Sequence, residues 1–178
     1  GGNKFAIDLI KQIDEMNNGQ YLYEETRNSP SSFCIGGAGY PEKHFEAMNL
    51  KSDLKHLKEK VDAGAEFIVT QLFYDNKKFF EFVDKCRAIG IQVPIIPGLK
   101  PITNLRHLSF IPKFFNTNFP EEFSNELEKC KSNEEVKKIG TEWAIEQSKE
   151  LINYGVPVPH FYTMGKGEAV KNIASEIF

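Results

Sequence analysis

Apolar residues recur at helical spacing in two segments near the start of the chain. Residues 4–16 carry apolar side chains three and four positions apart, and residues 50–61 repeat this spacing up to Gly64, a residue type that often ends a helix. The pattern therefore predicts two amphipathic helices. The positions that define them are Phe5, Leu9, Ile10, Ile13 and Met16 in the first and Leu50, Leu54, Leu57 and Val61 in the second.

Four short apolar segments, each bounded by turn-forming or polar residues, have the character of strands. They are residues 33–39, 67–73, 93–96 and 158–162. Residues 67–73 show little alternation of apolar and polar positions, which is typical of a strand buried on both faces. We expect the other three strands to be buried as well.

Further helix signals separate and follow these strands. Asn76 can cap a helix that stops at Gly90, and Thr103 can cap a short one. A longer insertion then leads to Ser132 and Glu135, which have the spacing of a capping box in front of a long helix. A last helix is expected over residues 167–178.

The order of these elements is one helix followed by four strand-helix units. Such alternation predicts a parallel sheet covered by helices, and both a doubly wound sheet and a (β/α)8 barrel satisfy it. A barrel normally needs about 250 residues and eight units. This chain has 178 residues and four units, begins on a helix and does not start with methionine, so we expect it to be part of a longer protein.

Composition and charge exclude several classes of protein. With 40% hydrophobic and 26% charged residues the chain is an ordinary globular one, and a net charge of -3 offers no broad cationic surface for nucleic acid. Three widely spaced cysteines indicate neither a disulfide framework nor a zinc site, and no metal site is expected. No apolar segment is long enough to span a membrane and no signal peptide is evident, so a cytoplasmic protein is predicted.

Polar residues follow each predicted strand, at the edge where ligands bind in parallel α/β folds. This set is rich in hydrogen-bonding groups and poor in carboxylates. It contains Tyr40, Pro41, Glu42 and His44 after the first strand, Thr70, Gln71, Tyr74 and Asp75 at the second, Lys100, Thr103, Asn104 and Arg106 after the third, and Tyr162, Thr163 and Lys166 after the fourth.

Individual positions in and near this set leave alternatives open. Gln71 stands in an apolar run, so its carboxamide either contacts a ligand or belongs to a polar layer inside a barrel. His44 can be a ligand contact or a packed loop residue. His56 and Lys60 lie four residues apart, as on a solvated helix face.

The sequence lacks the patterns of common catalytic machinery. It has no Ser-His-Asp order, no H-E-x-x-H motif and no close carboxylate pair at a strand end. Hydrogen-bonding groups without strong acids suit a site in which a flavin or nicotinamide carries the chemistry.

Several segments together resemble the methylenetetrahydrofolate reductase family. They are AGYPEKH (38–44), DLKHLKEKVDAGA (53–65), TQLFYD (70–75), PIIPG (94–98) and HFYT (160–163), and their order and spacing agree with the family over essentially the whole chain. The resemblance implies a (β/α)8 TIM barrel, of which residues 1–178 form the C-terminal half. It also implies FAD as cofactor, NADH or NADPH as hydride donor, and reduction of 5,10-methylenetetrahydrofolate to 5-methyltetrahydrofolate for methionine synthesis.

The resemblance also implies roles for individual residues. The matching FAD-contacting positions are Tyr40, His44, Ala47, Asp53, His56 and Lys60. Gln71 matches a position that contacts both nicotinamide and folate, His107 lies in a folate-facing segment, and Lys166 stands where the family has a folate-binding arginine. The family's catalytic glutamate and its Arg-Gly-Asp segment have no counterpart in these residues, so the chain alone is expected to be inactive.

Two other functions compete with this reading. One is a non-catalytic half-barrel that serves for binding or assembly. The other is a different barrel enzyme that binds a phosphorylated sugar or nucleotide, for which Gly165 and Gly167 are a weak signal. In the favoured interpretation the partners are small molecules, and a homo-oligomer is expected.

Overall fold

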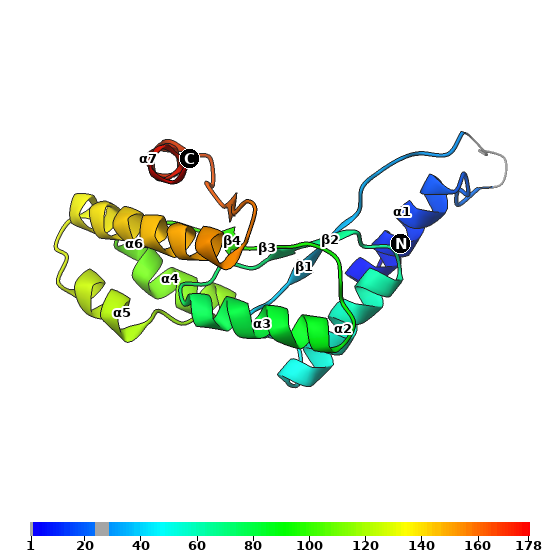
Figure 1. Ribbon diagram of the computed structural model, residues 1–178, viewed down its shortest axis with the longest axis horizontal. Coiled ribbons are helices and arrows are strands. Elements are labelled where there is room, and N and C mark those ends of the chain that lie inside the picture. Colours follow the sequence, from blue (N-terminus) through cyan, green and yellow to red (C-terminus); the bar gives the residue numbers. More distant parts are fainter. Residues whose placement is uncertain (1, 24–28) are drawn as a thin grey trace.

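The computed structural model describes residues 2–23 and 29–178, in which helices and strands alternate along the chain (Figure 1). The helices are α1 (Ala6–Asn17), α2 (Leu50–Asp62), α3 (Asn76–Ala88), α4 (Arg106–Phe115), α5 (Glu121–Glu128), α6 (Asn133–Tyr154) and α7 (Glu168–Ile177). The strands are β1 (Gly36–Gly39), β2 (Phe67–Thr70), β3 (Ile95–Ile96), β4 (Gly98–Leu99) and β5 (His160–Phe161).

All strand pairs are parallel, as the alternating pattern predicts. Strands β1, β2 and β3 form one sheet in that order, and β4 pairs with β5. Only Pro97 separates β3 from β4, so one segment of chain pairs first with β2 and then with β5. The predicted break at Pro97 is therefore a change of partner within one bent strand.

Thr70 connects the two sheets at this bend. Its side-chain Oγ1 accepts a hydrogen bond from Gly98 N at 2.9 Å, and its carbonyl accepts one from the Tyr162 hydroxyl at 2.9 Å. Thr70 is fully buried, so these bonds are shielded from water. The five strands thus act as one curved layer.

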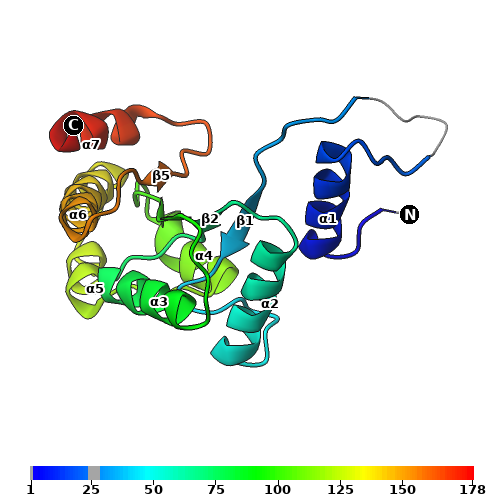
Figure 2. The ribbon, with the colours of Figure 1, turned by 45° about the vertical axis from the view of Figure 1, so that its right-hand side comes forward.

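The helices form a row that follows the curve of the strands. Helix α1 packs on α2, α2 on α3, α3 on α6, and α6 on α7. Figure 2 shows α1 and α7 at opposite ends of this row, with the strands between them. The main core lies between the strands and the helices, and its fully buried members include Ile68, Phe73, Phe79, Leu99 and Leu151.

The prediction that residues 67–73 are buried on both faces is wrong. Ile68 and Thr70 of β2 are buried, whereas Phe67 and Val69 are only partly so. The helix row covers one face of the sheet, and the alternate side chains point to the other. The first predicted strand also begins later than expected, since Phe33 is 59% exposed and pairing starts at Gly36.

Local capping explains where most helices begin and end. Gly64 and Gly90 adopt left-handed conformations after α2 and α3, as expected, and Ser132 caps α6 through Glu135 N. Two of the predicted caps are wrong by one residue. Asp75 rather than Asn76 caps α3, since its side chain accepts a hydrogen bond from Lys77 N. At the start of α4, Asn104 rather than Thr103 accepts a hydrogen bond through its side-chain oxygen, from His107 N.

The structure confirms a parallel α/β fold and leaves closure of a barrel as a prediction. Within the described residues, β1 and β5 each have one edge without a neighbouring strand. Helix α5, inside the segment that was expected to be an insertion, was not predicted. Among the described helices, none is both long and apolar enough to cross a bilayer.

The bend at Pro97 gives a test of the packing. A Cβ atom at Gly98 would lie 2.1 Å from the Thr70 carbonyl oxygen, so Gly98→Ala must shift backbone. We expect it to lower the free energy of unfolding by about 1–3 kcal/mol, the usual cost of overpacking. Gly37→Ala is the control, because its Cβ would meet Ala65 at an ordinary 3.7 Å. Urea unfolding followed by circular dichroism compares them, and equal stabilities would contradict this packing.

Candidate functional site

The carboxyl ends of the parallel strands bring the predicted site residues to one edge of the sheet. Tyr40 directly follows β1 and Gln71 directly follows β2. The strands are in register with Gly39 opposite Thr70, and Gln71 N donates to the Gly39 carbonyl at 2.8 Å. Tyr40 and Gln71 are therefore neighbours at the end of the sheet face that the helices leave open.

A first group of predicted residues gathers between the end of β1 and α2. Tyr40, Asp53 and Lys60 line a small pocket together with apolar residues of α2, and this pocket is too narrow to hold a water molecule, so a ligand could only lie over it. The Asp53 carboxylate accepts a hydrogen bond from His44 N at 2.8 Å. The rings of Tyr40 and His44 meet edge to face, with centroids 4.5 Å apart.

Lys60 supplies the positive charge of this group. Its ammonium donates to the Ala38 carbonyl at 2.5 Å, and burial lowers its pKa while the charge of Asp53 offsets part of that effect. No carboxylate of the described residues lies within ion-pair distance of its Nζ. The side chain is thus partly desolvated and available to an anionic group.

Loop 40–49 carries three of the predicted cofactor contacts. Lys43 has a positive φ of 85°, and its ammonium donates to the carbonyls of His44 at 2.8 Å and Ala47 at 2.7 Å. The backbone N–H of Ala47 in turn donates a hydrogen bond to the His44 carbonyl at 3.1 Å. His44, Ala47 and His56 do not line the pocket, and His56 differs from the rest of the set because its side chain is exposed on α2.

The second group occupies a cavity of about 160 Å³ at the ends of β4 and β5. It brings His107 and Lys166 together, although they are far apart in the sequence. The remaining lining residues are Lys100, Pro101, Thr103, Asn104, Tyr162, Thr163, Met164, Ala169 and Val170, with no carboxylate among them.

His107 is held in its neutral form. Burial first, and then the charges of Lys100, Lys166 and Arg106, lower its pKa to about 4. Its Nδ1 lies 3.3 Å from Thr103 N, a donor, and its Nε2 lies 2.9 Å from the Asn104 side-chain nitrogen. At neutral pH this imidazole acts as a hydrogen-bonding group and not as a cation.

Lys100 is a second cation in this cavity, for which the sequence gave no individual role. It stands among the polar residues after the third strand, but nothing in its neighbourhood in the sequence shows that it meets Lys166. Burial lowers the pKa of Lys100, and the one hydrogen bond of its ammonium within the described part of the chain is a long one, 3.5 Å to the Tyr162 carbonyl. Two lysines without a carboxylate among the cavity residues suit a ligand that carries negative charge.

Tyr40 and Tyr162 bring the two groups next to each other. Burial raises the pKa of the Tyr162 hydroxyl, and the nearby Tyr40 raises it further. Gln71 lies at the end of the strand between them, and its side-chain oxygen accepts from Leu72 N at 3.0 Å. Gln71 lines neither cavity, yet it stands at the boundary between the two groups.

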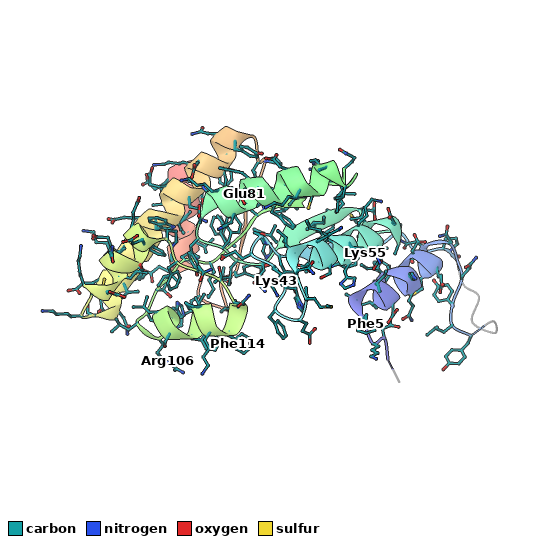
Figure 3. All side chains as sticks on the ribbon, turned by 90° about the horizontal axis from the view of Figure 1, so that it is seen from below. Phe5, Lys43, Lys55, Glu81, Arg106 and Phe114 are labelled. Carbon is teal, nitrogen blue, oxygen red and sulfur yellow. The ribbon has the colours of Figure 1, made fainter. Side chains whose placement is uncertain are left out.

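Helix α4 lies beside the loop of the first group. Figure 3 shows Lys43 on that loop, with Arg106 and Phe114 on the neighbouring helix. Hydrogen bonds from residues just after α4 to Glu42 confirm this proximity.

Comparison with known proteins identifies one family. The model of the family described as methylenetetrahydrofolate reductase matches residues 1–177. "Methylenetetrahydrofolate reductase 1" of Schizosaccharomyces pombe is 38% identical over 99% of this chain, and "Methylenetetrahydrofolate reductase (NADH) 1" of Arabidopsis thaliana is 41% identical over 92%. The chain spans 27% of the length of each relative.

A bacterial relative is covered to a greater extent. "5,10-methylenetetrahydrofolate reductase" of Pectobacterium carotovorum is 36% identical over 92% of this chain, which spans 51% of that protein. A solved structure of an uncharacterized Clostridium thermocellum protein, described as binding two copies of 5-methyl-5,6,7,8-tetrahydrofolic acid, superposes with a TM-score of 0.52 and 21% identity. The superposition covers 80% of this chain and 51% of that one. At this identity the likeness supports the fold alone.

The second cavity predicts the titration of His107. Its pKa should be about 4 in the folded protein, so the stability it contributes is present above the unfolded pKa of about 6.5 and is lost as pH falls toward 4. Lys100→Met should raise that pKa, because a neighbouring positive charge disappears, whereas the exposed Lys171→Met should leave it unchanged. Imidazole chemical shifts measured against pH test this, and an unaltered pKa in Lys100→Met would refute the arrangement.

Proposed function

Because the chain belongs to the methylenetetrahydrofolate reductase family, we propose that the protein containing it reduces 5,10-methylenetetrahydrofolate to 5-methyltetrahydrofolate. NADH or NADPH is the proposed hydride donor and FAD the proposed carrier between the two substrates. The observation that carries the proposal is the juxtaposition of two residue groups at one sheet edge. One offers a desolvated cation and a tyrosine beside a small pocket, and the other a cationic cavity.

The first group fits the flavin dinucleotide. Lys60 is a half-buried cation without a carboxylate partner among the described residues, which matches the charge of a diphosphate. On the open face of β1, Gly36 and Ala38 are exposed and small, so a flat ring system could approach the backbone closely. Tyr40 and the backbone of His44 would line the same region, and Asp53 holds His44 in place.

His56 has a weaker place in this proposal. It is exposed one turn before Lys60 on α2, so it would reach only an outlying part of the dinucleotide. Ala47 would contribute loop backbone. When bound, the flavin would accept a hydride from the nicotinamide and give it to the folate.

The second group suits the folate. The substrate's glutamate moiety is anionic, and Lys100 and Lys166 provide positive charge without a competing carboxylate in the cavity. Lysine at position 166 lacks the planar fork of the family's arginine, so its contact with a carboxylate is less directional. His107 would donate or accept a hydrogen bond as a neutral ring.

Gln71 would act for both substrates in turn. It lies at the end of β2, between Tyr40 of the first group and the cavity of the second. Its side-chain amide hydrogens have no acceptor among the described residues, because only its oxygen is engaged, by Leu72 N. An amide that can donate to either substrate fits a site that the nicotinamide and the folate occupy alternately.

The catalytic acid is proposed to lie outside these residues. The chain would form the C-terminal half of a (β/α)8 barrel whose remaining strands pair with the open edges of β1 and β5. The chain alone would then lack activity, and the whole protein would act as a cytoplasmic homo-oligomer.

The decisive experiment is a visible spectrum of the purified whole protein, followed by anaerobic additions. A flavin band that bleaches with NADH or NADPH and returns with methylenetetrahydrofolate is the expected result. A colourless protein that takes up no FAD would reject the flavin assignment and favour a binding or assembly role.

Lys60 gives a test of the flavin pocket. Lys60→Met should weaken FAD binding about tenfold or more, because one charge-assisted contact with phosphate is lost. Lys55→Met is a matched control on the same helix, since Lys55 is exposed and pairs only with Glu59 at 3.6 Å. FAD titration by fluorescence quenching measures both. Equal affinities of the two variants would remove Lys60 from the site.

A further inference from the structure

Glu42 makes a long-range connection that the proposed chemistry does not use. Its carboxylate accepts hydrogen bonds from the Thr117 hydroxyl, from Asn118 N at 3.2 Å and from the Asn118 side-chain amide at 3.0 Å. The partners lie 75 and 76 residues further along the chain. Hydrogen bonds to a charged acceptor are the stronger ones, and Thr117 is only 3% exposed.

This connection joins the two groups of site residues. Glu42 belongs to loop 40–49, which carries Tyr40 and His44. Thr117 and Asn118 directly follow Asn116, the left-handed residue that ends α4. The first turn of the same helix carries His107 into the second cavity. One carboxylate thus ties the end of α4 to the loop of the first group.

The loop needs an external anchor because it has no regular secondary structure to fix it. Lys43 holds a positive φ of 85°, a conformation that is unfavourable for a residue with a side chain and persists only when its surroundings enforce it. Among the residues that the structure describes, the Lys43 ammonium bonds only to carbonyls of its own loop, and the Asp53 carboxylate accepts from His44 N. Glu42 provides the hydrogen bonds that fix the opposite side of the loop.

We propose that Glu42 is a positioning residue, which holds loop 40–49 against the end of α4 so that the cofactor loop and the substrate cavity keep one relative geometry. This inference rests on the proposed function, since it takes the loop to contact flavin and the cavity to contact folate. Glu42 itself touches neither ligand. By holding the loop in one conformation before the ligand binds, Glu42 lowers the entropy cost of ordering the loop on binding.

The first test is Glu42→Gln in the whole protein. The amide removes the negative charge, keeps one acceptor oxygen and turns a donor toward the donors of Asn118, so the anchor is weakened while the side chain keeps its size. We expect FAD affinity to fall about tenfold, the equivalent of about one hydrogen bond to a charged acceptor. Glu46→Gln is the control, because Glu46 lies in the same loop, is mostly exposed and only approaches His44 at 4.0 Å.

A second measurement separates positioning from plain stability. At saturating FAD, Glu42→Gln should raise the KM for methylenetetrahydrofolate several-fold and change kcat little, since the reacting groups remain. The double variant Glu42→Gln with Asn118→Asp should restore FAD affinity, because the new amide can donate to the new carboxylate. A merely structural role would lower the melting temperature and leave FAD affinity and KM unchanged.

The outcomes distinguish this inference from the function on which it rests. If the wild-type protein binds no FAD, the proposed function fails and the inference with it. If the wild type binds FAD and Glu42→Gln binds it as tightly as Glu46→Gln does, only the positioning role of Glu42 is overturned. The positioning role would also be overturned if Glu42→Gln weakened FAD binding and the added Asn118→Asp substitution did not restore the affinity.

Discussion

Thr70 is the residue on which the arrangement of the site depends most directly. Thr70 ends β2, and its hydroxyl and carbonyl receive hydrogen bonds from Gly98 of β4 and from Tyr162, which follows β5. These bonds are buried, so water cannot replace them. Without this connection, the β1–β3 sheet and the β4–β5 pair would not hold Tyr40 and Tyr162 side by side.

Charge is distributed unevenly between the outer helices and the site. The chain as a whole carries a net charge of -3, and many of its lysines pair with glutamates or aspartates one helical turn away. Such exposed pairs contribute only about 0.2–0.5 kcal/mol each. Lys60 and Lys100 are different, because both are partly buried with no carboxylate within ion-pair distance among the described residues, and burial lowers the pKa of each. This desolvation makes them suited to anionic ligands.

The two residue groups are held with different rigidity. The second cavity is formed by the ends of β4 and β5, the first turn of α4, residues 163–166 and the start of α7, and the pairing of β4 with β5 sets the geometry of its strand side. The first group depends on loop 40–49, which has backbone hydrogen bonds of its own but is tied to other elements by side chains: Asp53 from α2, and Glu42 through the residues after α4. Side-chain anchors allow a loop to be ordered without making it part of the sheet.

The sequence by itself determined the parallel α/β order, the positions of most helices and the edge of the sheet at which the candidate site residues gather. These features depend on periodicity, on glycines such as Gly64 and on caps such as Ser132, all of which act over a few residues. The resemblance to a family added the residue roles. Three features could not be predicted from the sequence: the partial burial of one face of β2, the late start of β1 and the presence of α5. Each depends on which neighbouring elements cover the segment.

Tertiary structure alone decided which of the candidate residues meet. Lys100 and Lys166 line one cavity, Glu42 bonds to Thr117 and Asn118, and His56 is exposed on a helix that also carries Asp53. The local sequence around these residues gives no sign of any of these outcomes. The physical reason is that hydrophobic periodicity records which side of an element is buried, whereas the pairing of polar groups depends on how distant elements pack. That packing was fixed here by the bend at Pro97 and the close approach of Gly98 to Thr70.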